Sequence, residues 1–173
     1  MSVGMAPLSG DHSGSGSDFN DVEIRILRRG DHDILNRVAE GVFDNSIDNR
    51  LSEEFLGDPR HHLAVAIDGR FVVGIASAVH YVHPDKSPQL WINEVGVAPS
   101  HRGRGFGKRL MTALLEVGRH LGCSEAWVLT DRQNHSACRL YESIGCVKPP
   151  APAMFTFQLS ANNAESPIAQ VRK

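Results

Sequence analysis

A short glycine-rich segment has the residue types of an anion-binding loop. Residues 102–107 read Arg-Gly-Arg-Gly-Phe-Gly and lie between an apolar, strand-like run and an amphipathic helix that should begin near Gly105. Glycine has no Cβ, so the backbone can approach an anion closely. The first turn of a helix points its unpaired N–H groups and positive dipole end at such an anion. The segment therefore predicts a phosphate-binding loop.

The spacing excludes two common glycine loops. A P-loop requires Ser or Thr where this chain has Arg109. The dinucleotide fingerprint requires a third glycine where this chain has Lys108 or, in the other frame, Leu110. The pattern that fits is R-x-x-G-x-G, formed by Arg102, Gly105 and Gly107.

This loop resembles the pyrophosphate loop of the GCN5-related N-acetyltransferases, which reads R/Q-x-x-G-x-G/A after a central strand. Residues 134–145, N-H-S-A-C-R-L-Y-E-S-I-G, are similar to that family's N-x-x-A-x-x-L-Y-x-x-x-G helix at every fixed position. The two motifs occur in order, separated by one helix and one strand, and the resemblance covers residues 22–159. Cys146 stands where the family usually has an aromatic residue, which affects the expected path of the last strands.

The apolar periodicity predicts alternating strands and helices. Expected strands are Val22–Leu27, Leu63–Ile67, Phe71–His80, Leu90–Val97, Ala126–Thr130 and Met154–Leu159, with an Asp68-Gly69 hairpin turn. Expected helices follow Asp31 or Asp33 through Val42, then cover Asn49–Leu56, the stretch from Gly105 to Gly122, and Asn134–Ile144. With the resemblance, this order implies an α/β fold: a mixed sheet, splayed between its fourth and fifth strands, with helices on both faces.

The chain of 173 residues is expected to form one domain over residues 21–160. Residues 1–20 are rich in Ser, Gly and Asp and predict a disordered tail, and residues 161–173 predict a flexible one. Three cysteines without a C-x-x-C pair favour a reducing compartment, here the cytoplasm. A net charge of −2 argues against nucleic-acid binding, and no apolar run has membrane-spanning length.

Two side chains are candidates for acid–base chemistry on an amine. Glu94 lies in the central strand beside the expected gap, where a carboxylate could take a proton from an ammonium group. By the resemblance, Tyr141 is the general acid near the coenzyme A sulfur. The alternatives are a surface carboxylate for Glu94 and a core tyrosine for Tyr141. Cys138 suggests an acyl-cysteine route, but a small buried side chain is the simpler interpretation.

The resemblance also implies acetyl-CoA as the cofactor. Strand amides and carbonyls would meet the thioester and pantetheine, the glycine loop the pyrophosphate, and Asn134 the pantetheine arm. Gly96 should mark a strand bulge or a close backbone approach. The expected cofactor-binding residues are Val95, Gly96, Val97, Arg102, Gly103, Arg104, Gly105, Phe106, Gly107, Lys108, Asn134 and Ala137.

An excess of carboxylates between Asp31 and Asp58 could form an acidic rim that attracts a polycation, or could be an ordinary solvated surface. A narrower resemblance, over residues 81–84, 91–97 and 154–157, is to type I aminoglycoside 3-N-acetyltransferases. The expected partner is a small polycationic amine, and a homodimer is implied by family resemblance. The histidine spacing does not suit a metal site. Candidate substrate-binding residues are Asp44, Asp48, His80, Tyr81, Glu94 and Asp131.

Three function classes follow from these observations. The first is acetylation of an aminoglycoside amine, and the second is acetylation of a peptide, a polyamine or another small molecule. The third is a coenzyme A binding domain without catalysis, against which the presence of both Glu94 and Tyr141 argues.

Overall fold

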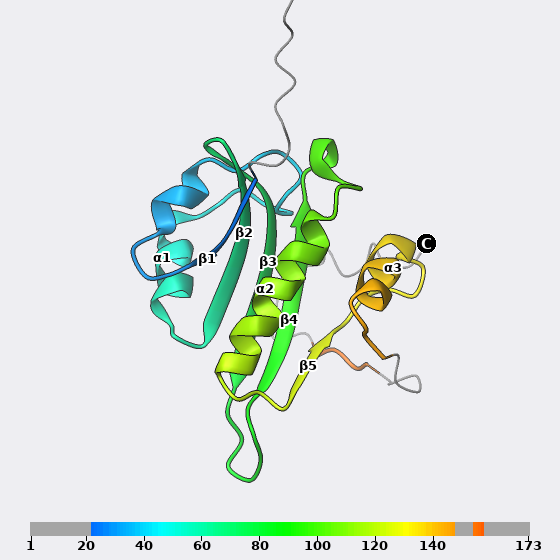
Figure 1. Cartoon of the computed structure of the whole chain (residues 1–173). Helices are drawn as coiled ribbons and strands as arrows, with labels where there is room; N and C mark the ends of the chain where they lie inside the picture. Colours follow the sequence, from blue (N-terminus) through cyan, green and yellow to red (C-terminus); the bar gives the residue numbers. More distant parts are fainter. Residues whose placement is uncertain (1–21, 148–153, 158–173) are drawn as a thin grey trace, which may run out of the picture.

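The computed structural model describes residues 22–147 and 154–157. Five strands form one sheet in the order β1-β2-β3-β4-β5 (Figure 1). β1 to β4 pair antiparallel, and β4 and β5 pair parallel. The strands are β1 Glu23–Leu27, β2 His61–Asp68, β3 Phe71–Tyr81, β4 Gln89–Val97 and β5 Glu125–Val128.

Helices lie on both faces of this sheet. A Cβ placed on Gly74 would contact Leu110 of α2, whereas a Cβ on Gly96 would overlap the carbonyl oxygen of Val42. Gly74 pairs with Val97, the neighbour of Gly96, so α2 and the Val42 segment cover opposite faces. The helical elements are η2 His32–Asn36, α1 Asn49–Gly57, η3 Pro99–His101, α2 Phe106–His120 and α3 His135–Ser143.

The main core lies between α2 and the centre of the sheet. Leu110, Met111 and Leu114 of α2 and Leu90 and Ile92 of β4 are almost completely buried. Each such side chain contributes about 1.5–3 kcal/mol through apolar burial. This packing fixes the start of α2, and therefore the glycine loop, against the end of β4. No described helix is long and apolar enough to cross a membrane.

The sheet opens between β4 and β5, as expected from the sequence. Only Gln89–Ile92 of β4 pair with Glu125–Val128, and β4 then continues to Val97 without β5 beside it. β5 ends at Val128, two residues earlier than predicted. The splay therefore begins immediately before Glu94.

The first predicted helix is wrong. In its place are the short 3-10 helix η2 and an irregular loop that includes Gly41, whose φ is 74°. Val38 forms an isolated bridge with Val72, and the Ala39 amide donates to the Val72 carbonyl. These tertiary hydrogen bonds hold the backbone near β3. Asp31 accepts a bond from the Arg28 amide and does not cap η2 with its side chain.

The predicted closing strand is also wrong where the structure describes it. Residues 154–157 have no strand conformation, and their apolar side chains are exposed, with Phe155 at 82%. A four-residue alternating pattern shows strand potential, but a strand forms only with a pairing partner. Residues 158–159 and both predicted tails lie outside the described residues.

Candidate active site

The glycine loop forms the entry to α2. Arg102 lies just after η3, and its Nε donates to the Val97 carbonyl oxygen at 2.9 Å, which ties the loop to the end of β4. Gly103 and Gly105 have φ values of 74° and 81°, in a left-handed region that residues with a Cβ rarely adopt. A Cβ on either glycine would meet no atom within 4 Å. The loop therefore leaves open space beside its backbone.

The first turn of α2 presents its amides to this space. The Arg109 amide bonds the Gly105 carbonyl, so the amides before Arg109 have no acceptor within the helix. These amides and the positive dipole end suit a diphosphate. The side chains have other tasks: Phe106 is buried, a Cβ on Gly107 would approach Leu140 of α3 at 3.1 Å, and Lys108 donates to the Ser143 carbonyl.

A bulge in β4 determines where Glu94 points. Ser77 pairs with Glu94 but the next residue, Ala78, pairs with Ile92, so Asn93 is an extra residue in β4. In a regular strand Ile92 and Glu94, which are two residues apart, would share a face. With the bulge, Ile92 faces α2 while Glu94 lies on the opposite face. The predicted bulge at Gly96 is wrong, whereas the close approach expected there is confirmed by the Val42 carbonyl.

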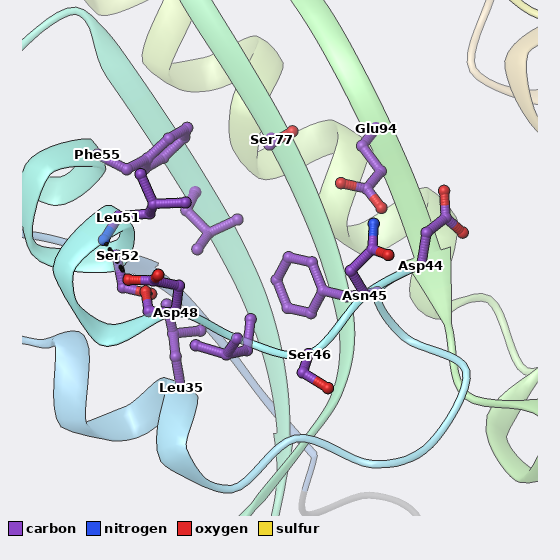
Figure 2. Close-up of a pocket in the computed structure, with 13 residues that line it drawn as sticks. Leu35, Asp44, Asn45, Ser46, Asp48, Leu51, Ser52, Phe55, Ser77 and Glu94 are labelled. Atoms are coloured by element: carbon purple, nitrogen blue, oxygen red, sulfur yellow. Dashed lines mark hydrogen bonds between the residues drawn. The ribbon is translucent and has the colours of Figure 1, made fainter. Parts of the chain in front are cut away.

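Glu94 lines a pocket of about 370 Å³ formed by the loop before α1, by α1 itself and by β2 and β3. Figure 2 shows the side-chain amide of Asn45 directed towards the Glu94 carboxylate, with Asp44 nearby. The lining residues are Leu35, Phe43, Asp44, Asn45, Ser46, Ile47, Asp48, Leu51, Ser52, Phe55, Leu63, Ser77 and Glu94. The pocket thus combines apolar walls with a group of carboxylates.

The pKa of Glu94 lies above its ordinary value, first because burial disfavours the charged form and second because Asp44 is nearby. A raised pKa makes a carboxylate a stronger base once it has lost its proton. Asp48 is placed differently, because its Oδ1 accepts from the Leu51 amide and caps α1. Its carboxylate therefore has a structural task as well as a place in the pocket.

The second sequence motif forms α3, which packs against α2. Asn134 caps this helix by accepting from the Ala137 amide at 3.1 Å. Tyr141 is half-buried against the core, and its pKa is raised, mainly by burial. A raised pKa keeps its phenol protonated over a wider pH range. Its helix packs on the α2 side of the sheet, whereas Glu94 opens on the other side.

Three candidate substrate residues lie outside this pocket. His80 belongs to the face that α2 covers, where its Nδ1 lies 2.8 Å from Nε2 of His62. Asp131 accepts from the Gln133 amide in the turn before α3. Tyr81 lies further along the face that carries Glu94. The structure thus brings together Glu94, Asp44 and Asp48 of the predicted set.

Sequence reasoning missed several pocket residues. Asn45 and Ser77 are polar residues without a motif, and Phe55 lies in α1 with no spacing that marks a binding role. Part of the predicted acidic rim is neutralised, because Asp58 pairs with Arg60 at 2.7 Å and Glu54 with Arg50 at 3.3 Å. The pocket carboxylates Asp44, Asp48 and Glu94 take part in no such ion pair among the described residues.

Comparison with known proteins agrees with this arrangement. The family model described as "Acetyltransferase (GNAT) family" matches residues 32–146. N-alpha-acetyltransferase RimI of Mycobacterium tuberculosis is 34% identical over 133 residues, which are 75% of this chain and 80% of that protein. The chain therefore belongs to the GNAT acetyltransferase family, whose members use acetyl-CoA.

Other relatives are aminoglycoside enzymes. Aminoglycoside N(6')-acetyltransferase type 1 of Serratia marcescens is 29% identical over 126 residues, 66% of this chain and 86% of that protein. A solved structure of an aminoglycoside acetyltransferase from an uncultured soil metagenomic sample, in complex with sisomicin, shares the fold with a TM-score of 0.71. It is 21% identical, over 82% of this chain and 98% of that one.

Several further relatives share only one part of their length with this chain. The matched region spans 20–38% of a rat N-acetyltransferase family 8 member 2 and of two bacterial mycothiol acetyltransferases. All of these names describe acetyltransferases. Together, the family model and these relatives support an acetyltransferase domain of the GNAT family over the matched residues.

Proposed function

We propose that this protein transfers the acetyl group of acetyl-CoA to a primary amine of a polycationic small molecule, an aminoglycoside. The observation that carries the proposal is the bulge at Asn93. This bulge directs the Glu94 side chain towards an acidic pocket at the point where β4 separates from β5. Residues 21–160 would form the catalytic domain. The glycine loop and the open splay would hold acetyl-CoA on the α2 side, with the acceptor on the other side.

Each site residue has a defined task in this reaction. Acetyl-CoA supplies the acyl group as a thioester. The Glu94 carboxylate takes a proton from the acceptor ammonium, directly or through water, and so exposes the nitrogen lone pair. The nitrogen bonds the acyl carbon as the carbon–sulfur bond breaks. The Tyr141 hydroxyl donates the proton that the departing thiolate needs, and the second proton that the nitrogen loses on becoming an amide restores the phenol through solvent.

An aminoglycoside suits this base better than a lysine side chain. An isolated lysine amine has a pKa of about 10.4, so little of it is neutral at pH 7. Repulsion among several ammonium groups on one small molecule lowers their pKa values. Glu94 then removes a more loosely held proton, and Asp44 attracts the remaining charges.

The acceptor's reacting position is a finer part of the proposal. Resemblance of residues 81–84, 91–97 and 154–157 to 3-N enzymes favours the 3-N amine. The relative from Serratia marcescens acts, by its name, at the 6' position. A nuclear magnetic resonance spectrum of the purified product distinguishes these positions, since the proton beside the acetylated nitrogen shifts.

Similarity to RimI favours a second candidate, acetylation of a peptide α-amine. The deciding experiment compares kcat/KM for sisomicin, spermidine and an N-terminal alanyl peptide by thiol release from acetyl-CoA. The aminoglycoside proposal requires the largest value for sisomicin. A larger value for the peptide would replace it with the RimI-like activity.

A further inference from the structure

Two stacked indole rings lie on the face of the sheet that carries Glu94. Trp91 of β4 and Trp127 of β5 are register partners, with ring centroids 5.0 Å apart and planes within 8° of parallel. Trp91 is 37% exposed. The pair therefore leaves part of the Trp91 ring exposed to solvent at the edge of the splay.

The position of this pair relative to Glu94 follows from the strand register. Ser77 pairs with Glu94, and Val79, two residues further along β3, pairs with Trp91. Residues two apart in a strand share a face and lie about 7 Å apart. Ser77 lines the Glu94 pocket, so the indole pair lies one row beyond that pocket.

A chain of hydrogen bonds fixes the indole pair in place. The Trp127 Nε1–H donates to the Tyr81 hydroxyl at 3.1 Å, and that hydroxyl donates to Gln89 Oε1 at 2.8 Å. Gln89 Nε2 then donates to a carboxylate oxygen of Glu125 at 3.0 Å. The rings are thus held in one orientation, and an exposed carboxylate lies at the far end of the chain.

We propose that Trp91 and Trp127 form a subsite for the acceptor, which holds the sugar ring next to the one that carries the reacting amine. This inference rests on the proposed function. Indole faces attract ammonium groups and pack against the apolar faces of saturated rings. Glu94 on one side and Glu125 on the other complement a ring that carries several positive charges.

The same geometry separates aminosugars from the other candidate acceptors. The row that carries Trp91 lies about 7 Å from the row that carries Glu94, so one acceptor molecule can reach both. A linear polyamine has charges but no ring face to stack. The subsite therefore selects a cyclic, polycationic acceptor.

Intrinsic fluorescence tests this subsite without any turnover. The chain has only two tryptophans, and both belong to the pair. We expect sisomicin to cause a saturable change in tryptophan fluorescence of the enzyme held at saturating coenzyme A, with spermidine producing a much smaller one. No saturable change over a titration that extends to millimolar sisomicin would overturn the subsite.

Substitutions provide the second test. Trp91→Ala should raise KM for sisomicin about 3- to 30-fold, the range of a cation–π contact, with KM for acetyl-CoA unchanged. Trp91→Phe should retain most of the affinity. Phe71→Ala removes another exposed aromatic side chain at the opposite end of β3 and should leave both KM values unchanged.

The outcomes separate the subsite from the proposed function. Acetylation of sisomicin with an unchanged KM in Trp91→Ala would overturn the subsite and leave the function standing. If sisomicin is never acetylated, the proposed function fails. The fluorescence titration still decides the subsite in that case, because it measures binding alone.

Discussion

At the residue scale, the site depends on one carboxylate in an unusual setting. In a regular strand Glu94 would share the α2 face with Ile92, but the bulge at Asn93 places it on the opposite face, among apolar walls and beside Asp44. Burial and the neighbouring charge both raise its pKa. The same features that make Glu94 costly for the fold make it suitable as a base.

Glu94→Gln is expected to reduce kcat by about 10- to 10⁴-fold, the usual range for loss of a general base. Stability should change in the other direction. A carboxyl with a raised folded-state pKa favours the fold below its unfolded pKa, and this contribution is lost as pH rises through the folded pKa. Glutamine removes that loss, so thermal unfolding at pH 8 should occur at an equal or higher temperature. A lower unfolding temperature with unchanged kcat would contradict both roles.

Asp44→Asn is expected to move the acid limb of the pH–kcat profile to lower pH. As the proposed base, Glu94 would act only when deprotonated, and Asp44 helps to raise its pKa. Removing the Asp44 charge therefore lets Glu94 lose its proton at a lower pH. Asp48→Asn is the matched control, because asparagine also caps helices well and Asp48 does not contribute to the Glu94 shift. Equal displacement of the limb in both variants would contradict this account.

At the element scale, the sequence predicts what local pattern and motif control. The glycine loop, α2, α3 and the splay were predicted correctly, because turn chemistry and helical periodicity act over a few residues. The bulge at Asn93 has no local signal. The first helix failed because backbone bonds to Val72, more than thirty residues away, replaced the helical ones. The pocket depends on these two non-local features, so only part of it was predictable.

Gly105→Glu is expected to weaken acetyl-CoA binding by about tenfold or more beyond the effect of Gly105→Ala. Both variants share the backbone strain of a φ near 81°, but only glutamate brings a negative charge to the predicted diphosphate site. Isothermal titration gives both affinities. Gly69→Glu, in the β2–β3 hairpin with the same strained region of φ, controls for added charge elsewhere. Equal affinities in the two Gly105 variants would remove the phosphate from this loop.

Gly96→Ala is expected to lower the free energy of unfolding by about 1–3 kcal/mol, because its Cβ would overlap the Val42 carbonyl. That contact holds the pocket loop against β4. Gly57→Ala, at the end of α1, has open space around it and should cost nothing comparable. Urea denaturation measures both. Similar unfolding free energies for the two variants would show that the loop is not held in this way.

At the scale of the whole molecule, the two faces of the sheet divide the work. Figure 1 shows α2 crossing one face, with α3 beside it. The glycine loop and Tyr141 belong to that side, and the Glu94 pocket opens on the other. The gap between β4 and β5 is where the two sides meet. The chain has a net charge of only −2, so attraction of the proposed polycationic acceptor would come from the pocket itself.

The central claim is that this protein moves an acetyl group from acetyl-CoA to an amine, and mass spectrometry of the acceptor tests it most directly. Purified protein is incubated with acetyl-CoA and sisomicin. The amounts of free thiol and of acetylated product are then measured separately in the same sample. We predict one acetyl group on sisomicin for each thiol released, with product formation strongly reduced by Glu94→Gln. Thiol release without acetylated sisomicin, or equal product from the Glu94 variant, would contradict the account.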